Sequence, residues 1–126
     1  IDVPVTYGGP DGPDLVDVAR ACGLTEDEVV RRHVAGEYRV CFIGFLPGFP
    51  YLGPLDASLR VPRRATPRPR VSSGSVAIAG DYTGIYPWES PGGWHLIGRT
   101  HLRLFDLARV PPVSLAPGMR VRFVAA

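Results

Sequence analysis

The chain has 126 residues, 45% of them hydrophobic, which is enough for one domain with a buried core. Its formal net charge is only +2, which gives little support for nucleic-acid binding, and no apolar run approaches the roughly 18 residues of a membrane span. All 14 basic residues are arginine, which excludes lysine as a catalytic base or Schiff-base former.

The first 40 residues predict one strand and two helices. Val3–Tyr7 is expected to be a short strand, and Asp14–Cys22 has apolar residues at the i, i+3, i+4 and i+7 spacing of a helix face. A second helix is expected to begin at Thr25, which can form a capping box with Glu28, and to end at Gly36.

The rest of the chain predicts short strands separated by Gly/Pro turns. The expected strands are Tyr38–Phe45, Val76–Ala79, Gly84–Tyr86, His95–Gly98, Leu102–Phe105 and Met119–Val124. In the last of them, apolar residues alternate with two arginines, which is the period of a half-buried strand. This pattern indicates a barrel or a sandwich.

The charges and the cysteines bear on partners and compartment. Residues 1–40 carry a net charge of −4 and residues 41–126 a net charge of +6, which suggests two surfaces with different partners. We interpret Cys22 and Cys41 as small buried hydrophobic residues in a reducing compartment, with a disulfide as the alternative. They do not space with the three histidines as a zinc site would. We therefore expect a cytoplasmic protein without a metal site.

The stretch IGFLPGFPYLGPL, residues 43–55, carries aromatic side chains on a frame of glycine and proline. Its prolines reduce the freedom of the unfolded loop, and its glycines permit close approach or positive φ. Phe45, Phe49 and Tyr51 are then either the wall of a pocket or docking platform, or rings that plug the end of a barrel.

The stretch RVPRRATPRPRV, residues 60–71, contains five arginines and no acid. Its proline spacing favours an extended path, and arginine forks suit carboxylate or phosphate groups. It is either a solvated basic edge or an anion site built from one or two of these arginines. Nucleic acid is the weaker interpretation, because the aromatic residues lie elsewhere.

Residues 74–100 repeat the combination of proline, glycine and aromatic residues, and they end shortly after an arginine. The loop YPWESPGGW, residues 86–94, precedes the strand that leads to Arg99. A buried arginine must have a partner, so Arg99 either pairs with an internal acid such as Asp81 or faces a ligand anion.

The sequence gives no evidence of a self-contained catalytic centre. Ser75, His95 and Asp81 can be grouped as a triad, but no Gly-x-Ser-x-Gly elbow is present. A P-loop and a dinucleotide fingerprint are also absent.

Four blocks of the sequence, taken together, resemble a known family over essentially the whole chain. They are GFLPGFPYLGPLD, VPRRATPR, GSVAIAGDYTGIYPWESPGGWHLIGRT and the terminal PGMRVRFV. The chain resembles the allophanate hydrolase subunit 1 family, which includes the PxpB-type 5-oxoprolinase subunits and the kinase inhibitor KipI and is related to half of the urea carboxylase carboxyltransferase domain. The resemblance implies a mainly β, cyclophilin-like closed barrel with two short helices near the N-terminus. Residues 1–126 would be this single domain, and we expect the N-terminal domain of the family to be absent from this chain, which begins with isoleucine.

The function that the resemblance implies is that of a subunit, inactive alone, in an ATP-dependent 5-oxoprolinase that opens 5-oxoproline to glutamate. The implied partners are a homologous subunit 2 (PxpC- or KipA-like) and a third subunit (PxpA-like), with neither nucleic acid nor membrane involved. ATP would be used by the assembly, and no cofactor would be bound by this domain. The alternatives are a KipI-like inhibitor of a sensor histidine kinase, an allophanate hydrolase or urea carboxylase type of activity, and, from the fold alone, a prolyl isomerase.

The resemblance also implies which residues line a cleft for a small carboxylate substrate, although it names no catalytic residue. They are Phe49, Tyr51, Arg68, Ser75, Tyr86, Trp94 and Arg99. Arg99 or Arg68 would hold the carboxylate, and the aromatic residues would pack on the ring. Two departures from the family pattern lie beside these positions, because Ser72-Ser73 replaces proline-alanine and His101 replaces proline.

Overall fold

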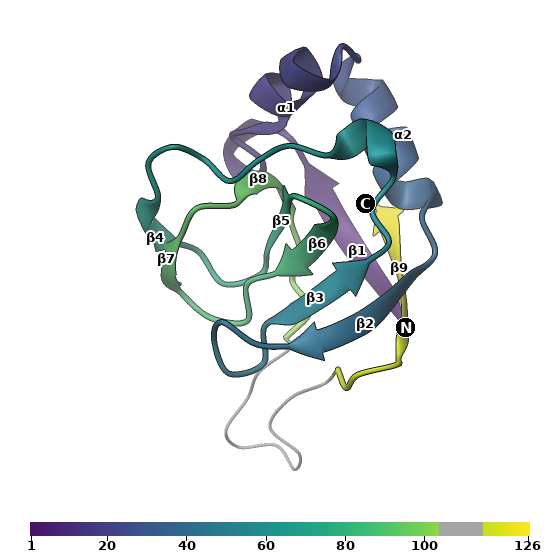
Figure 1. Cartoon of the computed structure of the whole chain (residues 1–126), viewed down its shortest axis with the longest axis vertical. Coiled ribbons are helices and arrows are strands. Elements are labelled where there is room, and N and C mark those ends of the chain that lie inside the picture. Colours follow the sequence, from purple (N-terminus) through teal and green to yellow (C-terminus); the bar gives the residue numbers. More distant parts are fainter. Residues whose placement is uncertain (104–114) are drawn as a thin grey trace.

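The computed structural model describes residues 1–103 and 115–126, which form a closed β-barrel with two helices at one end (Figure 1). The helices are α1 (Leu15–Cys22) and α2 (Glu26–Ala35). The barrel strands are β1 (Asp2–Tyr7), β2 (Tyr38–Ile43), β3 (Pro50–Gly53), β5 (Ser75–Ala79), β6 (Tyr82–Ile85), β8 (His95–Arg99) and β9 (Arg120–Ala125). Outside the barrel, β4 (Arg68–Val71) and β7 (Ser90–Gly92) form a two-stranded sheet, and 3-10 helices occur at Gly9–Asp11 and Ala57–Leu59. The predicted mainly β, closed-barrel fold with two helices near the N-terminus is confirmed.

The order of the strands around the barrel is β1-β8-β5-β6-β3-β2-β9. All neighbours are antiparallel except β1 and β9, which run parallel, with Val3 opposite Phe123. The barrel therefore closes where the first and last strands of the chain meet (Figure 1). Such a contact between distant segments is non-local, and its loop-closure entropy must be offset by packing.

The core fills the barrel and continues beneath the two helices. Side chains alternate between the interior and solvent along β1 and β9, as the period of 2 predicts for β9. Val5 and Phe123 are fully buried in this way, and Leu15, Val18 and Val29 of the helices join the same cluster. The helices thus close one end of the barrel with their apolar faces.

The start of α2 follows its capping signal. The Oγ1 atom of Thr25 accepts a hydrogen bond from the backbone N–H of Glu28 at 3.1 Å, so the predicted cap is confirmed. The Glu28 carboxylate accepts hydrogen bonds from the side chains of Arg31 and Arg32 on the next turn. These charge-assisted bonds lower the pKa of Glu28 to about 2.

One histidine joins α2 to the barrel interior. His33 is fully buried, and its Nε2 atom lies 2.9 Å from Thr83 Oγ1, whose hydroxyl donates to the Ala77 carbonyl. Thr83 must therefore accept from Nε2–H, which leaves Nδ1 to accept the hydroxyl proton of Tyr7 at 2.6 Å. Burial lowers the pKa of His33 to about 3, so the imidazole is neutral at physiological pH.

Some predicted strand boundaries are wrong. No strand was predicted at residues 46–55, but Pro50–Gly53 forms β3 and pairs with β2 and β6. The predicted Tyr38–Phe45 strand ends at Ile43. Leu102 and Arg103 lie outside any strand, and the rest of the predicted Leu102–Phe105 strand falls outside the described residues. Local composition missed β3 because its hydrogen-bond partners come from elsewhere in the barrel.

The two cysteines are free, and the prediction that both are buried is wrong. Side chains along β2 alternate between the two faces of the strand, so Tyr38 and Val40 face inward. Cys41 faces outward and is therefore exposed. Cys22 is half-buried, and burial raises the pKa of its thiol.

The described part of the chain contains neither a candidate metal site nor a candidate membrane-spanning helix. Residues 1–103 and 115–126 contain no group of three or more His, Cys, Asp or Glu that could hold a metal ion. Within the same ranges, neither helix is long and apolar enough to cross a membrane.

Candidate functional site: a basic hollow at the end of β8

Most arginines of the basic stretch at residues 60–71 pair with acids of the protein itself. Three of its five arginines make ion pairs with acids: Arg60 with Asp81 at 2.8 Å, Arg68 with Asp14 at 2.6 Å, and Arg70 with Glu89 at 3.3 Å. The charge of this segment is therefore largely used in holding it to the rest of the molecule.

Arg68 was predicted to line a cleft, but the structure places it in a bidentate pair with Asp14. Its two terminal nitrogens donate to the two carboxylate oxygens at 2.6 and 2.7 Å, and the backbone N–H of Leu96 donates to the same carboxylate at 2.7 Å. Asp14 is 4% exposed. Burial alone would raise the pKa of Asp14, but the Arg68 and Leu96 hydrogen bonds bring it below its usual range. Arg68 is thus committed to joining β4, α1 and β8, and a ligand would have to displace Asp14 to reach it.

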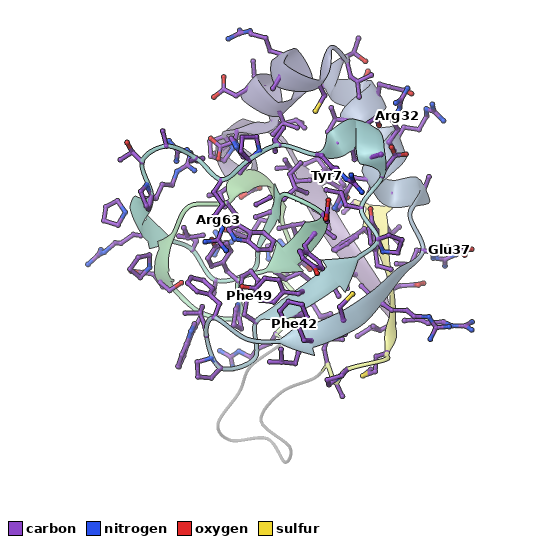
Figure 2. All side chains as sticks on the ribbon, viewed as in Figure 1. Tyr7, Arg32, Glu37, Phe42, Phe49 and Arg63 are labelled. Atoms are coloured by element: carbon purple, nitrogen blue, oxygen red, sulfur yellow. The ribbon has the colours of Figure 1, made fainter. Side chains whose placement is uncertain are left out.

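Three of the predicted cleft aromatics form an interior group, which we call the aromatic cluster: Phe49, Tyr86 and Trp94. The ring of Phe49 meets those of Tyr86 and Trp94 edge to face, with centroids 5.1 and 5.2 Å apart. Phe49 and Tyr86 are fully buried, and Trp94 is 4% exposed; Figure 2 shows Phe49 among the enclosed side chains. The expectation that these rings rim an open cleft is wrong, because their mutual packing removes them from solvent.

Tyr51 and Ser75 lie at the borders of this cluster. Tyr51 is half-buried and stacks on the exposed ring of Phe42, with centroids 4.3 Å apart. Ser75 is 4% exposed and opens β5, opposite Arg99 of β8. Asp81 follows the other end of β5 and pairs with Arg60, so Ser75 and Asp81 cannot belong to one triad.

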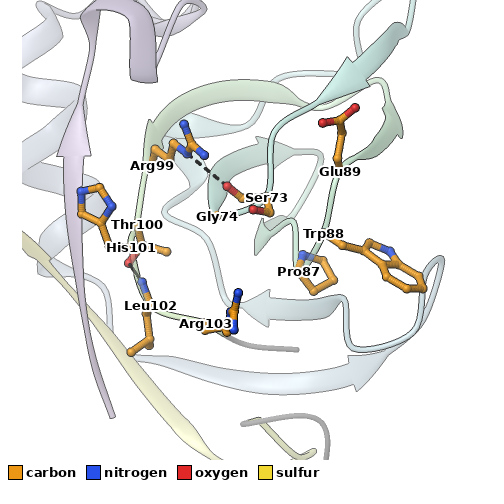
Figure 3. Close-up of a pocket in the computed structure, with 10 residues that line it drawn as sticks. All are labelled: Ser73, Gly74, Pro87, Trp88, Glu89, Arg99, Thr100, His101, Leu102 and Arg103. Atoms are coloured by element: carbon orange, nitrogen blue, oxygen red, sulfur yellow. Dashed lines mark hydrogen bonds between the residues drawn. The ribbon is translucent and has the colours of Figure 1, made fainter. Parts of the chain in front are cut away.

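An open hollow of about 520 Å³ lies where β8 ends (Figure 3). We call it the basic hollow. It is lined by Ser73, Gly74, Pro87, Trp88, Glu89, Arg99, Thr100, His101, Leu102 and Arg103. Of the residues predicted to bind substrate, only Arg99 lines it. Its volume lies within the range of small-molecule sites.

Arg99 is exposed at this hollow and is oriented by the backbone. Its Nε atom donates to the carbonyl oxygen of Ser73 at 3.1 Å, as Figure 3 shows. No carboxylate among the described residues pairs with it, and Asp81, the internal acid considered from the sequence, is engaged by Arg60. Of the two alternatives for Arg99, pairing with Asp81 is therefore excluded. The remaining nitrogens of the guanidinium are placed to meet an anion.

The floor of the hollow is main chain at Gly74. The N–H of Gly74 donates to the Tyr86 carbonyl at 2.7 Å, and its own carbonyl accepts from Thr100 at 2.8 Å. Its φ is +83°, and a Cβ atom there would lie only 2.2 Å from the Thr100 oxygen. Glycine is thus required here, because any side chain would separate Gly74 from the strand end that carries Arg99.

The wall opposite Arg99 is formed by Pro87, Trp88 and Glu89 (Figure 3). The lining carries two guanidinium groups, from Arg99 and Arg103, and one carboxylate, from Glu89, which pairs with Arg70. The exposed guanidinium of Arg99 favours an anionic ligand at this hollow. The sequence reasoning missed Trp88 and Arg103, although Trp88 belongs to the aromatic loop at residues 86–94 that it had singled out.

The chain is a small closed β-barrel with an open hollow, lined in part by Arg99, at the end of a strand. The family described as "Carboxyltransferase domain, subdomain C and D" matches residues 1–115, and the chain belongs to this family. The family resemblance inferred from the sequence blocks is thereby confirmed, and the curated relatives below agree with it.

Two curated relatives and one solved structure illustrate the similarity. The chain is 58% identical to a 5-oxoprolinase subunit, the one designated B, of Escherichia coli O157:H7, over 98% of this chain and 57% of that protein. It is 48% identical to the 5-oxoprolinase subunit of the same designation of Bacillus subtilis strain 168, over 98% of this chain and 52% of that protein. The crystal structure of a conserved uncharacterized protein of Pyrococcus horikoshii is 51% identical, with a TM-score of 0.96, over 100% of this chain and 58% of that one. The chain thus spans about half the length of the relatives it matches.

Proposed function

We propose that the chain is the barrel part of a subunit in an ATP-dependent amide hydrolase assembly of the 5-oxoprolinase type. The observation that carries the proposal is the 58% identity to a 5-oxoprolinase subunit, which extends over 98% of this chain. Identity at this level along the whole barrel favours a shared role more strongly than the fold does, because folds are reused for unrelated functions.

The geometry of the basic hollow supports a binding role for this chain within that assembly. Arg99 would hold the carboxylate of the substrate, and the partner subunits would complete the site. The lining offers the exposed guanidinium of Arg99, and main chain at Gly74, for binding an anion. The catalytic groups and the use of ATP are then assigned to the assembly, and the chain alone is expected to be inactive.

The partners we propose are a homologous subunit 2 and a third subunit, and the substrate is a small carboxylate, 5-oxoproline. We place the assembly in the cytoplasm, where ATP is available and the free thiols of Cys22 and Cys41 persist. The prolyl isomerase alternative rests on fold alone, so we do not propose it.

The proposal is tested by co-purification of the chain with the two other subunits, followed by an assay of ATP-dependent 5-oxoproline hydrolysis. We expect turnover by the complete mixture and none by the chain alone. A chain that binds a sensor histidine kinase instead, and yields no hydrolysis with the other subunits, would overturn the proposal in favour of an inhibitor.

The role of Arg99 is tested in the same assembly with Arg99→Met. Loss of charge-assisted hydrogen bonds to a carboxylate is expected to raise KM about tenfold or more. Arg20→Met, which removes an exposed arginine of α1 whose ion pair with Asp17 spans 3.9 Å, is the matched control and should leave KM unchanged. Equal KM values for the two variants would remove Arg99 from the site.

A further inference from the structure

We propose that Arg63, Arg64 and the hydroxyl of Tyr86 form a second anion site, separate from the basic hollow, and that it takes a small doubly charged oxyanion such as phosphate. We call it the buried anion site. It lies under the segment that runs along the outside of the barrel from the 3-10 helix at Ala57–Leu59 to β4 (Figure 1). The inference does not depend on the proposed function.

The hydroxyl of Tyr86 is buried without a partner. Tyr86 is 0% exposed, and its oxygen has no hydrogen-bond partner among the described residues. Gly92 of β7 lies against this oxygen, because a Cβ atom there would be only 2.0 Å from it. Burial raises the pKa of Tyr86, so the hydroxyl keeps its proton. The backbone N–H of Trp94 and the side chains of Arg63 and Arg68 act against this rise, but all three are donors. The hydroxyl proton therefore lacks an acceptor.

Arg64 supplies a second buried donor without a partner. Its backbone N–H donates to the Gly93 carbonyl at 2.7 Å, directly after Gly92, so Arg64 and the Tyr86 hydroxyl contact adjacent residues of the chain. The side chain of Arg64 is half-buried, and its Nη1 atom is enclosed with no hydrogen-bond partner in residues 1–103 and 115–126. A charged N–H group that is shut off from water and has no acceptor is costly.

The neighbouring carboxylate does not supply the missing acceptor. Asp14 already accepts from both terminal nitrogens of Arg68 and from the backbone N–H of Leu96. Burial would raise the pKa of Asp14, and Arg64 is one of the cations that lower it, yet the described residues show no ion pair between the two. Arg63, Arg64 and Arg68 thus bring three positive charges to one carboxylate, and two of these charges are left without compensation.

These features specify the class of ligand. Because the groups without partners are all donors, the ligand must be an acceptor, and guanidinium groups suit phosphate oxygens. Two uncompensated charges are balanced by a dianion, whereas a single carboxylate would balance only one of them. Asp17 also acts on Arg68, but it is exposed and faces Arg20 at 3.9 Å. Arg63 is exposed and Arg64 is half-buried, so an anion can reach the site from solvent.

The first test compares two tyrosines in a chloride buffer that contains no oxyanion. Tyr86→Phe removes a hydroxyl without a partner, so we expect an unchanged thermal midpoint. Tyr38→Phe, the matched control, removes a buried hydroxyl that donates to the His33 carbonyl at 2.7 Å, and it should lower the midpoint by about 2–6 °C. A similar decrease in Tyr86→Phe would mean that an ordered water already satisfies the hydroxyl, and it would overturn the inference.

The second test titrates the chain with inorganic phosphate by calorimetry, with acetate and chloride compared at equal ionic strength. The Arg99→Met chain is used, so that the basic hollow does not contribute. We expect a lower Kd for phosphate than for acetate, and no binding of chloride. In this background, Arg64→Met and Tyr86→Phe should each weaken phosphate binding about tenfold or more. Arg60→Met removes the same charge from the same segment, but Arg60 pairs with Asp81, so this control should leave Kd unchanged.

Three results of the titration would also overturn the inference. They are no phosphate binding by the Arg99→Met chain, acetate binding as tight as that of phosphate, and an unchanged Kd in Arg64→Met or Tyr86→Phe. The thermal midpoint of each variant shows whether it is folded. The proposed function fails separately, because none of these measurements involves hydrolysis of 5-oxoproline.

Discussion

The aromatic cluster and the basic hollow use neighbouring residues of one stretch of chain, yet the first is sealed and the second is open. Tyr86 is fully buried, whereas Trp88, two residues later, is 38% exposed at the hollow. The same contrast separates two arginines: Arg68 is bound to Asp14 from two nitrogens, while Arg99 donates to a single main-chain carbonyl. Aromatic and basic residues in similar sequence contexts therefore have two different roles. Tyr86 and Arg68 stabilise the barrel, whereas Trp88 and Arg99 lie at the hollow. For the two arginines, the division follows from the carboxylate of Asp14, which pairs with Arg68 and not with Arg99.

The largest effect is expected from opening the aromatic cluster. Phe49→Ala should lower the free energy of unfolding by about 3–5 kcal/mol, because a fully buried ring is replaced by a cavity between Tyr86 and Trp94. Phe45→Ala at the neighbouring turn is the control, since Phe45 is 58% exposed, and its effect should stay within about 1 kcal/mol. Urea denaturation of both variants measures the difference. Equal losses would mean that the cluster does not support the barrel.

The next largest effect is expected from Asp14→Ala. It leaves the Arg68 guanidinium without its carboxylate and the Leu96 N–H without its acceptor, and we expect a loss of about 3 kcal/mol in the free energy of unfolding. In the double variant with Arg68→Met, the loss should be smaller than the sum of the two single losses, because the isolated charge is gone. Strict additivity would show that the pair does not act as one unit.

An intermediate effect is expected from acid, through His33. The folded state holds the pKa of His33 at about 3, below the ordinary value of 6.5, so the unfolded chain takes up a proton between these values and the folded chain does not. The stabilising contribution is complete above about pH 6.5 and decreases by up to about 1.4 kcal/mol for each pH unit as the pH falls towards 3.

This dependence is checked by urea denaturation between pH 7 and pH 5, above the range where most carboxylates titrate. His33→Gln should flatten the profile in this window, and His101→Gln, at an exposed histidine, should not. A profile that keeps its slope in His33→Gln would contradict the assignment.

The smallest effect on stability is expected at the basic hollow itself. Arg99→Met should change the free energy of unfolding by no more than about 0.5 kcal/mol, because the side chain is exposed and makes one hydrogen bond to Ser73. The same variant is expected to lose affinity for 5-oxoproline. A substitution at the hollow should therefore weaken binding with little loss of stability, whereas a substitution in the aromatic cluster should lower stability. A large loss of stability in Arg99→Met would place Arg99 with Arg68 as a residue that holds the barrel together.

The parts of the fold that depend on local pattern could be predicted from the sequence. The spacing of apolar residues in 14–22 indicated α1, and the Thr25 cap indicated the start of α2. The alternation in residues 119–124 indicated β9. By contrast, the strands β3, β4 and β7 were not predicted, because each contains a proline, which disfavours a strand assignment. Their strand partners are distant in the sequence or have no strong strand pattern themselves.

The candidate site could be predicted only in part. Arg99 lines the basic hollow, whereas Phe49, Tyr86, Trp94 and Arg68, which were expected in the same cleft, lie elsewhere. Nothing in the sequence near Arg68 indicates its partner Asp14, which is 54 residues away. Trp88 and Trp94 are the same type of residue in the same loop, so the sequence does not predict which of them is buried. Side-chain exposure depends on which elements pack over a residue, and composition does not contain that information.

The sequence by itself determined the mainly β class, the two helices and the glycine- and proline-framed loops, since these follow from residue type and from spacing along the chain. It determined the family, and through that resemblance the closed barrel, from its long sequence blocks. Only the tertiary structure decided that the ring of Tyr86 is buried while that of Trp88 is exposed. It also decided that the guanidinium of Arg68 pairs with a carboxylate whereas that of Arg99 bonds to a main-chain carbonyl. The physical reason is that pairing and burial are satisfied between segments far apart in the chain, such as Asp14 with Arg68 and β1 with β9.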